Sequence, residues 1–232
     1  MEAIPSSPIH PPAGAVSACQ KCGECCRRYA ISALPHELER QAKFFKMGEK
    51  EFIGVYGRIL LQFLPFPSAD HPLAMHVSMI PKSTYEQLKR NGFTGDYAML
   101  LPMIGFKKEE YCVFFDPKSF GCSMHLVKPM QCTLFPFTSL NDNEEYSKAY
   151  DFCEQSQILS PTHKTKEIQS YHRQEWKTFF DKVALKGLKG GYDHWPGEGD
   201  VIHNGKIIGK ITLPNLHTLI ELSRNKSSST HS

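Results

Sequence analysis

The sequence lacks the long apolar and long basic runs that are typical of membrane-spanning and nucleic-acid-binding proteins. Its most apolar stretch, RILLQFLPFP at residues 58–67, is interrupted by Gln62 and two prolines and is far short of the roughly 20 residues that cross a bilayer. The 27 Lys and Arg residues and the 24 Asp and Glu residues are spread along the chain, so no basic run could follow a phosphate backbone. We therefore expect no membrane partner and no nucleic-acid partner.

The motifs of several common enzyme classes are also missing. There is no G-x-S-x-G motif, no P-loop, no dinucleotide-binding fingerprint and no H-E-x-x-H pattern, so no catalytic residue can be assigned. Residues 1–18 contain four prolines and no basic segment, which is unlike a secretory signal peptide. We expect a cytoplasmic protein, and cytosolic thiols are kept reduced.

In place of these motifs the sequence has eight cysteines in two groups, one at residues 19–26 and one that begins at residue 112. The eight are Cys19, Cys22, Cys25, Cys26, Cys112, Cys122, Cys132 and Cys153. Thiolates at C-x-x-C spacing can converge on one cation because the loop between them turns back, and Gly23 can adopt the positive φ that a tight turn needs. Inert buried cysteines do not explain four thiols among Gln, Lys, Gly and Glu. We predict that all eight are metal ligands.

The spacing does not decide how the eight cysteines are divided among metal sites. In CQKCGECC the fourth cysteine is adjacent to the third, unlike the run of a ferredoxin. Adjacent side chains diverge in extended chain, so Cys25 and Cys26 are expected to serve different metals or ligand sets. Two four-sulfur sites, or one four-cysteine cluster with extra thiols, are both compatible with the pattern. The cations Lys21, Arg27 and Arg28 could offset the negative charge of thiolates.

Two further side chains near the second group are candidates for the site. His125 follows Cys122 by three residues and could bind a metal or a sulfur, although a polar loop histidine is the simpler interpretation. Asp116 precedes Pro117 and is expected in a turn, with a proton-carrying role at an open metal position as the alternative.

Proline and glycine punctuation, together with apolar periodicity, predicts most of the secondary structure. Helices are predicted over 35–48, 49–64, 81–92 and 161–186. Short strands or extended loops are predicted over 97–106 and 110–125, and the Asn204-Gly205 pair predicts a β-hairpin over 200–213. The expected fold class is α+β, mainly helical with irregular cysteine-rich loops and short strands, in a small single domain stapled by metal.

The composition also predicts the domain limits. Residues 1–17 are rich in Pro and Ser, and residues 223–232 consist mostly of small polar residues, so both are expected to be disordered tails. Between them we expect a cysteine-cluster metal-binding domain at 18–155. A C-terminal helix and hairpin at 156–222 would pack on it.

The order and neighbours of the cysteines resemble those of a known family. The segment CVFFDPKSFGCSMHLVKPMQCTLFPF at 112–137, preceded by CQKCGECC, is similar to the YkgJ-type cysteine-cluster family, named for its CxxCxxCC motif and described as a "putative zinc- or iron-chelating domain". The likeness includes the Gly121-Cys122 pair, the Phe135-Pro136 pair and the later Cys153. Lys128 and Thr133 stand where the family often has Arg, and Lys lacks the planar donor fork of Arg.

The resemblance implies zinc or an iron–sulfur cluster held by two groups of four cysteines, with iron–sulfur favoured. Metal ions are then the expected partners, and a protein partner or substrate is left open. The alternative is an iron–sulfur-dependent redox or protein-modifying enzyme, distantly similar to a flagellin lysine N-methylase. However, no glycine-rich strand-to-helix loop that could bind S-adenosylmethionine is recognisable. Metal binding is therefore the predicted function, and enzyme activity is left open.

Overall fold

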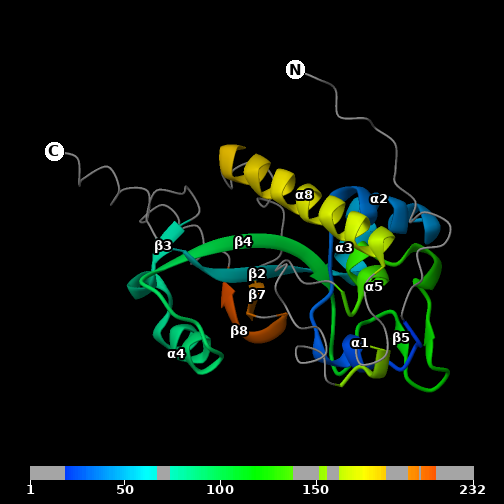
Figure 1. Ribbon diagram of the computed structural model, residues 1–232, viewed down its shortest axis with the longest axis horizontal. Helices are drawn as coiled ribbons and strands as arrows, with labels where there is room; N and C mark the ends of the chain where they lie inside the picture. The colour runs from blue at the N-terminus through cyan, green and yellow to red at the C-terminus, as the bar shows by residue number, and fades with distance from the viewer. Residues whose placement is uncertain are drawn as a thin grey trace.

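The fold is built around a mixed sheet. The computed structural model describes residues 19–66, 74–137, 152–155, 162–186, 198–203 and 205–212. The sheet has six strands in the order β1-β4-β2-β7-β8, with β3 paired to β4 (Figure 1). The strands are β1 (Ser32–Ala33), β2 (Gly57–Phe66), β3 (Ala74–His76), β4 (Tyr97–Phe106), β7 (Glu198–His203) and β8 (Lys206–Thr212). The α+β class agrees with the prediction, but the expectation of a mainly helical protein with short strands is wrong, because helices account for 44% and strands for 26% of the described residues.

Helices lie around this sheet, and two short helices carry some of the cysteines. They are α1 (Glu24–Arg28), α2 (Pro35–Phe44), α3 (Glu49–Tyr56), α4 (Lys82–Arg90), α5 (Met130–Leu134) and α8 (His163–Lys186), with short 3₁₀ helices η1 (Val77–Met79) and η2 (His125–Val127). A separate two-stranded ribbon pairs β5 (Phe115–Asp116) with β6 (Gly121–Cys122). The predicted helices over 81–92 and 161–186 match α4 and α8. Among the described residues, no helix combines the length and apolar character needed to span a membrane.

The predicted helix over 49–64 is wrong beyond residue 56, where β2 begins. The side chains of Ile59, Leu61 and Phe63 are buried in one core cluster, and Leu60 is buried in another. A strand that is apolar on both faces is typical of a central position in a sheet. Over a few residues, the same run of apolar side chains also fits one face of a helix. Pairing of β2 with β4 along ten residues makes both strands long. Residues 97–106, which form β4, were predicted to be short strands or extended loops.

Helices cover both faces of the sheet. On one face, Trp176 of α8 shares a cluster with Leu60 and Met103. On the other face, Leu88 of α4 packs with strand residues such as Val201. Figure 1 shows α4 and β3 near one end of the sheet, and α1, β5 and α5 together near the other end. The cysteine-bearing elements are therefore gathered at one end.

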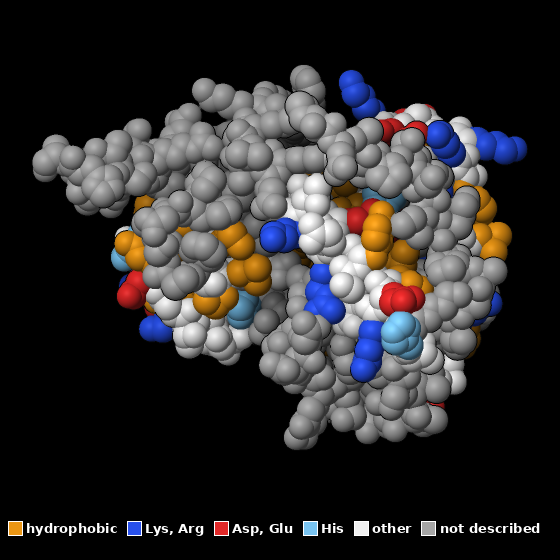
Figure 2. Space-filling view, turned by 45° about the horizontal axis from the view of Figure 1, so that its top comes forward, with side chains coloured by type: hydrophobic (Ala, Val, Ile, Leu, Met, Phe, Trp, Pro, Cys, Tyr) orange, Lys and Arg blue, Asp and Glu red, His pale blue; other side chains and the backbone are white. Residues whose placement is uncertain are grey.

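The C-terminal hairpin extends the same sheet. Strands β7 and β8 are antiparallel, Gly205 has a φ of 73° at the turn, and β7 runs parallel to β2. The hairpin agrees with the prediction, although Asn204 lies outside the described residues, as do both predicted tails. In Figure 2, the described hydrophobic side chains are exposed in two separate places, with Lys and Arg side chains between them. The described part of this face therefore mixes basic and apolar side chains.

Candidate metal centre

The register of the sheet explains how the two cysteine groups meet. Ser32 of β1 pairs with Gly105 of β4 in antiparallel fashion, so the start of β1 lies beside the end of β4. The first cysteine group ends shortly before β1, and the second begins shortly after β4. The backbone N–H of Cys112 donates a hydrogen bond to the carbonyl oxygen of Cys26 at 3.0 Å. Segments that are distant in sequence are thus in direct contact.

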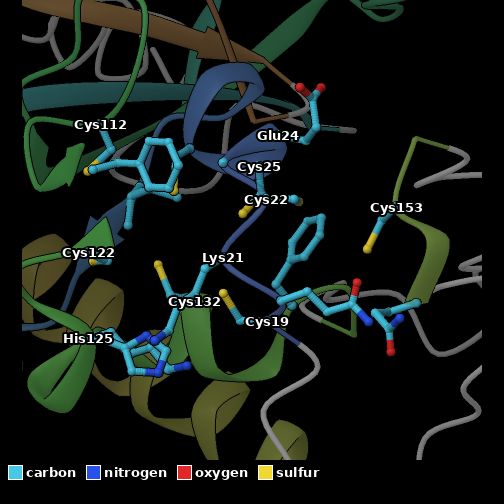
Figure 3. Close-up of a pocket in the computed structure, with 18 of the residues that line it drawn as sticks. Cys19, Lys21, Cys22, Glu24, Cys25, Cys112, Cys122, His125, Cys132 and Cys153 are labelled. Carbon is cyan, nitrogen blue, oxygen red and sulfur yellow. The ribbon is translucent and has the colours of Figure 1, made fainter. Parts of the chain in front are cut away.

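All eight predicted cysteines line one cavity of about 210 Å³. Cys19 and Cys22 lie on the loop before α1, Cys25 and Cys26 on α1, Cys112 after β4, Cys122 on β6, Cys132 on α5, and Cys153 in the segment 152–155. Figure 3 shows the sulfur atoms of Cys19, Cys132 and Cys153 pointing toward a common space from separate segments. The structure therefore brings together every cysteine that the sequence singled out.

A glycine makes the turn into α1 possible. Gly23 has a φ of 81°, and a Cβ atom built on it would lie 2.4 Å from Cε1 of Phe115. Only glycine avoids both the left-handed strain and this clash. The turn leads into α1, so Cys25 and Cys26 lie next to each other on a helix, and both line the cavity. Whether they serve different metals or ligand sets stays a prediction.

Buried polar side chains fix α5, which bears Cys132. The carboxylate of Glu37 is 1% exposed and accepts a hydrogen bond from the backbone N–H of Met130 at 2.6 Å. The Gln131 side-chain oxygen accepts hydrogen bonds from both the backbone N–H and the hydroxyl of Ser32, each at 2.9 Å. These bonds tie α5 to α2 and β1. Neither side chain was predicted from the sequence, where only the position of Gln131 next to Cys132 pointed to one of them.

An aromatic cluster holds the segment that bears Cys153. The ring of Phe152 lies 5.8 Å from that of Tyr29 and 6.0 Å from that of Phe135, measured between centroids. The Arg28 guanidinium carbon is 4.5 Å from the Phe152 centroid, a cation–π distance. This packing places Cys153 at the edge of the cavity opposite the β5–β6 ribbon (Figure 3).

Burial and mutual proximity disfavour thiolates in the metal-free cavity. Burial raises the pKa of Cys112 to about 11 and also raises the pKa values of Cys122 and Cys132, with neighbouring thiols adding to each. The hydrogen bond from Cys26 lowers the pKa of Cys25 and raises that of Cys26. A thiophilic cation would supply the positive charge that these sulfurs need, so its binding would release protons.

Of the three expected cations, Lys21 lines the cavity, whereas Arg27 and Arg28 pair with an acidic residue of α1. Arg27 and Arg28 form salt bridges with Glu24 at 2.8 and 2.9 Å, and Glu24 itself lines the cavity. Lys128 lines the cavity, and Lys108, just after β4, bonds carbonyl oxygens at the end of α1. Burial lowers the pKa of Lys108. In the sequence, only its position four residues before Cys112 pointed to Lys108 as a residue of the site.

The two other candidate residues have different places. His125 lines the cavity, where burial and the charge of Lys128 lower its pKa. Asp116 accepts hydrogen bonds from the backbone N–H of Lys118 at 2.9 Å and from the Ser119 hydroxyl at 2.6 Å. The prediction of a turn at Asp116 is therefore confirmed, and Asp116 lines a neighbouring surface pocket.

The cysteine side chains are chemically suited to a metal, although their sulfur atoms do not converge on one point. In the part of the chain that the structure describes, no three Cys, His, Asp or Glu side chains are arranged to hold a metal ion. Thiolates are nevertheless the ligands that zinc and iron–sulfur clusters prefer, and rotation about χ1 moves a sulfur atom without moving the backbone. The residues present fit such a group, and the roles of individual cysteines stay a prediction.

A cavity lined by cysteines from separate segments is typical of cysteine-ligated metal proteins. The model of the CxxCxxCC family, described as "Putative zinc- or iron-chelating domain", matches residues 18–154, and the chain belongs to this family. The predicted resemblance is therefore confirmed. No curated protein and no solved structure matched the chain. Family membership supports a metal-binding role without deciding between zinc and iron, and α8 and the hairpin lie beyond the matched residues.

Proposed function

We propose that the chain holds a metal centre through its two groups of four cysteines, and that this centre is an iron–sulfur cluster in preference to zinc. The observation that supports the proposal is the single cavity lined by all eight cysteines. Family membership supports metal chelation in general. The reduced thiols that such a centre requires are consistent with a cytoplasmic location.

Eight thiols exceed the four ligands of one zinc ion, and they allow either two four-thiolate sites or one cluster with further thiols beside it. A structural zinc ion takes four ligands, and the cavity offers eight sulfur atoms. A single four-thiolate site, of zinc or of an iron–sulfur cluster, would leave half of these sulfur atoms unused. The preference for iron–sulfur rests on the resemblance of the cysteine motif.

The experiment is anaerobic purification and reconstitution with iron and sulfide, followed by metal and acid-labile sulfide analysis and by visible and Mössbauer spectra. We expect stoichiometric iron and sulfide with broad visible absorption. Cys132→Ser should lose most of this absorption, because Cys132 lies on α5 inside the cavity. The matched control is Ser123→Ala, since Ser123 follows Cys122 but is exposed and does not line the cavity.

Two results would overturn the proposal at different levels. Stoichiometric zinc with no cluster under any anaerobic condition would exclude iron–sulfur and leave a cysteine-ligated zinc site. Absence of any bound metal, or metal content that Cys132→Ser does not change, would exclude the metal centre itself.

We further propose that residues 156–222 form one folding unit with the metal-binding domain at 18–155. Ile202 of β7 and Trp176 of α8 share a core cluster with Leu60 of β2, which supports this organisation. Truncation after residue 155 should therefore lower the stability of the whole sheet. A truncated chain with an unchanged free energy of unfolding would contradict it.

A further inference from the structure

Lys108 joins the two cysteine groups through the end of α1. Its Nζ atom donates hydrogen bonds to the carbonyl oxygen of Cys26 at 3.1 Å and to that of Arg27. The Cys26 oxygen also accepts the hydrogen bond from the Cys112 backbone. The final carbonyls of a helix carry a partial negative charge and have no partner within the helix, so a lysine ammonium is a suitable cap.

The ammonium of Lys108 is also placed to act on the sulfur atoms. Lys108 and Cys112 form an isolated antiparallel β-bridge, and the ammonium bonds the Cys26 carbonyl oxygen, so Lys108 lies between cysteines of the two groups. The charges of Arg27 and Arg28 are directed to Glu24 at the surface, and the side chains of these arginines are about 40% exposed. The charge of Lys108 is half-buried and therefore less screened by solvent.

The backbone around Lys108 is held by the neighbouring strand β2. Arg58 of β2 donates hydrogen bonds to the carbonyl oxygens of Phe106 at 2.9 Å and Lys108 at 3.4 Å. The same guanidinium forms an ion pair with Asp200 of β7, and the two side chains are 17% and 8% exposed. The segment from β4 to Cys112 is therefore fixed by the hairpin, which lies outside the matched family region.

We infer that Lys108 is a positioning residue of the metal centre, which holds the end of α1 against the Cys112 segment and offsets the negative charge of the metal-bound thiolates. The inference rests on the proposed function. Residues that orient and polarise metal ligands typically change metal affinity about 10- to 100-fold when they are replaced. We expect an effect of this size for Lys108.

The neighbouring lysine provides a matched control. Lys107 donates hydrogen bonds through Nζ to the carbonyl oxygens of Gly54 at 2.9 Å and Val55 at 2.6 Å, near the end of α3. It is exposed, and its ammonium bonds carbonyl oxygens of α3 and not those of a cysteine-bearing segment. Lys107→Met and Lys108→Met therefore each remove one lysine that caps a helix, and only the second removes a charge beside the thiols.

The test is an anaerobic titration of the metal-free full chain with Co²⁺ in competition with a chelator, read by thiolate-to-cobalt charge-transfer absorption. Lys108→Met should weaken Co²⁺ binding about 10- to 100-fold. Lys107→Met should leave the binding unchanged, and Lys108→Arg, which retains the charge, should restore most of it. Urea unfolding of the metal-free variants reports whether the two Met variants are equally stable.

Several outcomes would overturn the inference. Equal losses of Co²⁺ affinity in Lys107→Met and Lys108→Met would show a general effect of helix capping. Unchanged affinity in Lys108→Met would show that its charge has no effect on the site. If Lys108→Met does not fold, a Lys108→Arg variant that folds but binds Co²⁺ as weakly as a cysteine variant would exclude the charge as the cause. Wild-type protein that binds neither Co²⁺ nor iron would instead overturn the proposed function.

Discussion

Replacing Gly23 by alanine should disturb the cysteine cavity by a predictable amount. Gly23 has a φ of 81°, and the added Cβ atom would lie 2.4 Å from two carbons of the Phe115 ring. Phe115 lines the cavity and packs against the ring of Tyr111 at 5.3 Å. The turn and the ring cannot both keep their positions, so the loop before α1 should move.

The cost has two components. A left-handed backbone costs a residue with a Cβ atom about 1–2 kcal/mol, and an overpacked contact adds about 1–3 kcal/mol. Gly92 separates the two components, because its φ is 87° and a Cβ atom there would meet nothing within 4 Å. Gly92→Ala should therefore cost only the backbone component, and Gly23→Ala should cost about 1–3 kcal/mol more.

Urea unfolding of the metal-free protein measures both costs, and chelator competition measures metal affinity. Gly23→Ala should weaken metal binding, whereas Gly92→Ala should not, since Gly92 lies after α4 at the other end of the sheet. Combining Gly23→Ala with Phe115→Leu should remove part of the clash and reduce the cost of the alanine. Equal losses of stability in Gly23→Ala and Gly92→Ala would refute the role assigned to Phe115.

Four further predictions concern the fold and its coupling to the site. Burial lowers the pKa of His172 to about 4 from 6.5, so the unfolded chain binds the proton first, and stability should fall by about 3 kcal/mol as pH drops from 6.5 to 4. Asp200→Asn leaves Arg58 without its carboxylate and should cost about 3 kcal/mol in urea unfolding, with weaker metal binding. Glu37→Ala removes the acceptor of the Met130 N–H and should cost about 2–4 kcal/mol, with weaker metal binding through α5. Metal removal should increase hydrogen exchange in α1 and β5–β6, while β2 and β4 stay protected.

Each of these has a control or a contrary result. His172→Gln should flatten the acid dependence, and an identical pH profile would exclude His172 as its source. Glu39→Gln, which breaks an exposed pair with Lys43, should leave stability unchanged beside Asp200→Asn. Glu37→Ala with unaltered metal affinity would show that α5 does not depend on this carboxylate. Loss of protection in β2 on chelation would show that the metal supports the whole sheet.

The sequence predicted the cysteine set and several elements because their signals are local. The Pro start and Gly stop around 81–92, the long apolar pattern over 161–186 and the Asn204-Gly205 pair each report on residues close in sequence. The segment RILLQFL could not be assigned in this way, since its apolar residues suit a helix face as well as a buried strand. Pairing with β4, some 40 residues later, decides in favour of the strand.

In the site, too, the features that depend on neighbouring residues could be predicted, and those that depend on long-range contacts could not. Cysteine spacing indicated metal ligands, and the positive φ of Gly23 was expected from the tight turn. The role of Phe115 against this glycine, and the contact of Lys108 with the Cys26 carbonyl, depend on segments that meet only in the folded chain. The nearer cations, Arg27 and Arg28, were chosen from proximity in sequence, but Glu24 engages them instead.

Folding of the sheet therefore brings the two cysteine groups together without the help of a metal. Closing a long loop between two ligand groups costs conformational entropy, and the pairing of Ser32 with Gly105 meets this cost as the protein folds. A metal that then binds has mainly to reorient side chains, so its affinity depends on the stability of this end of the sheet. Because Arg58 and Asp200 link the same end to β7, substitutions in the hairpin can change metal affinity without contacting a sulfur atom. The region beyond the family match would in this way support the proposed metal centre.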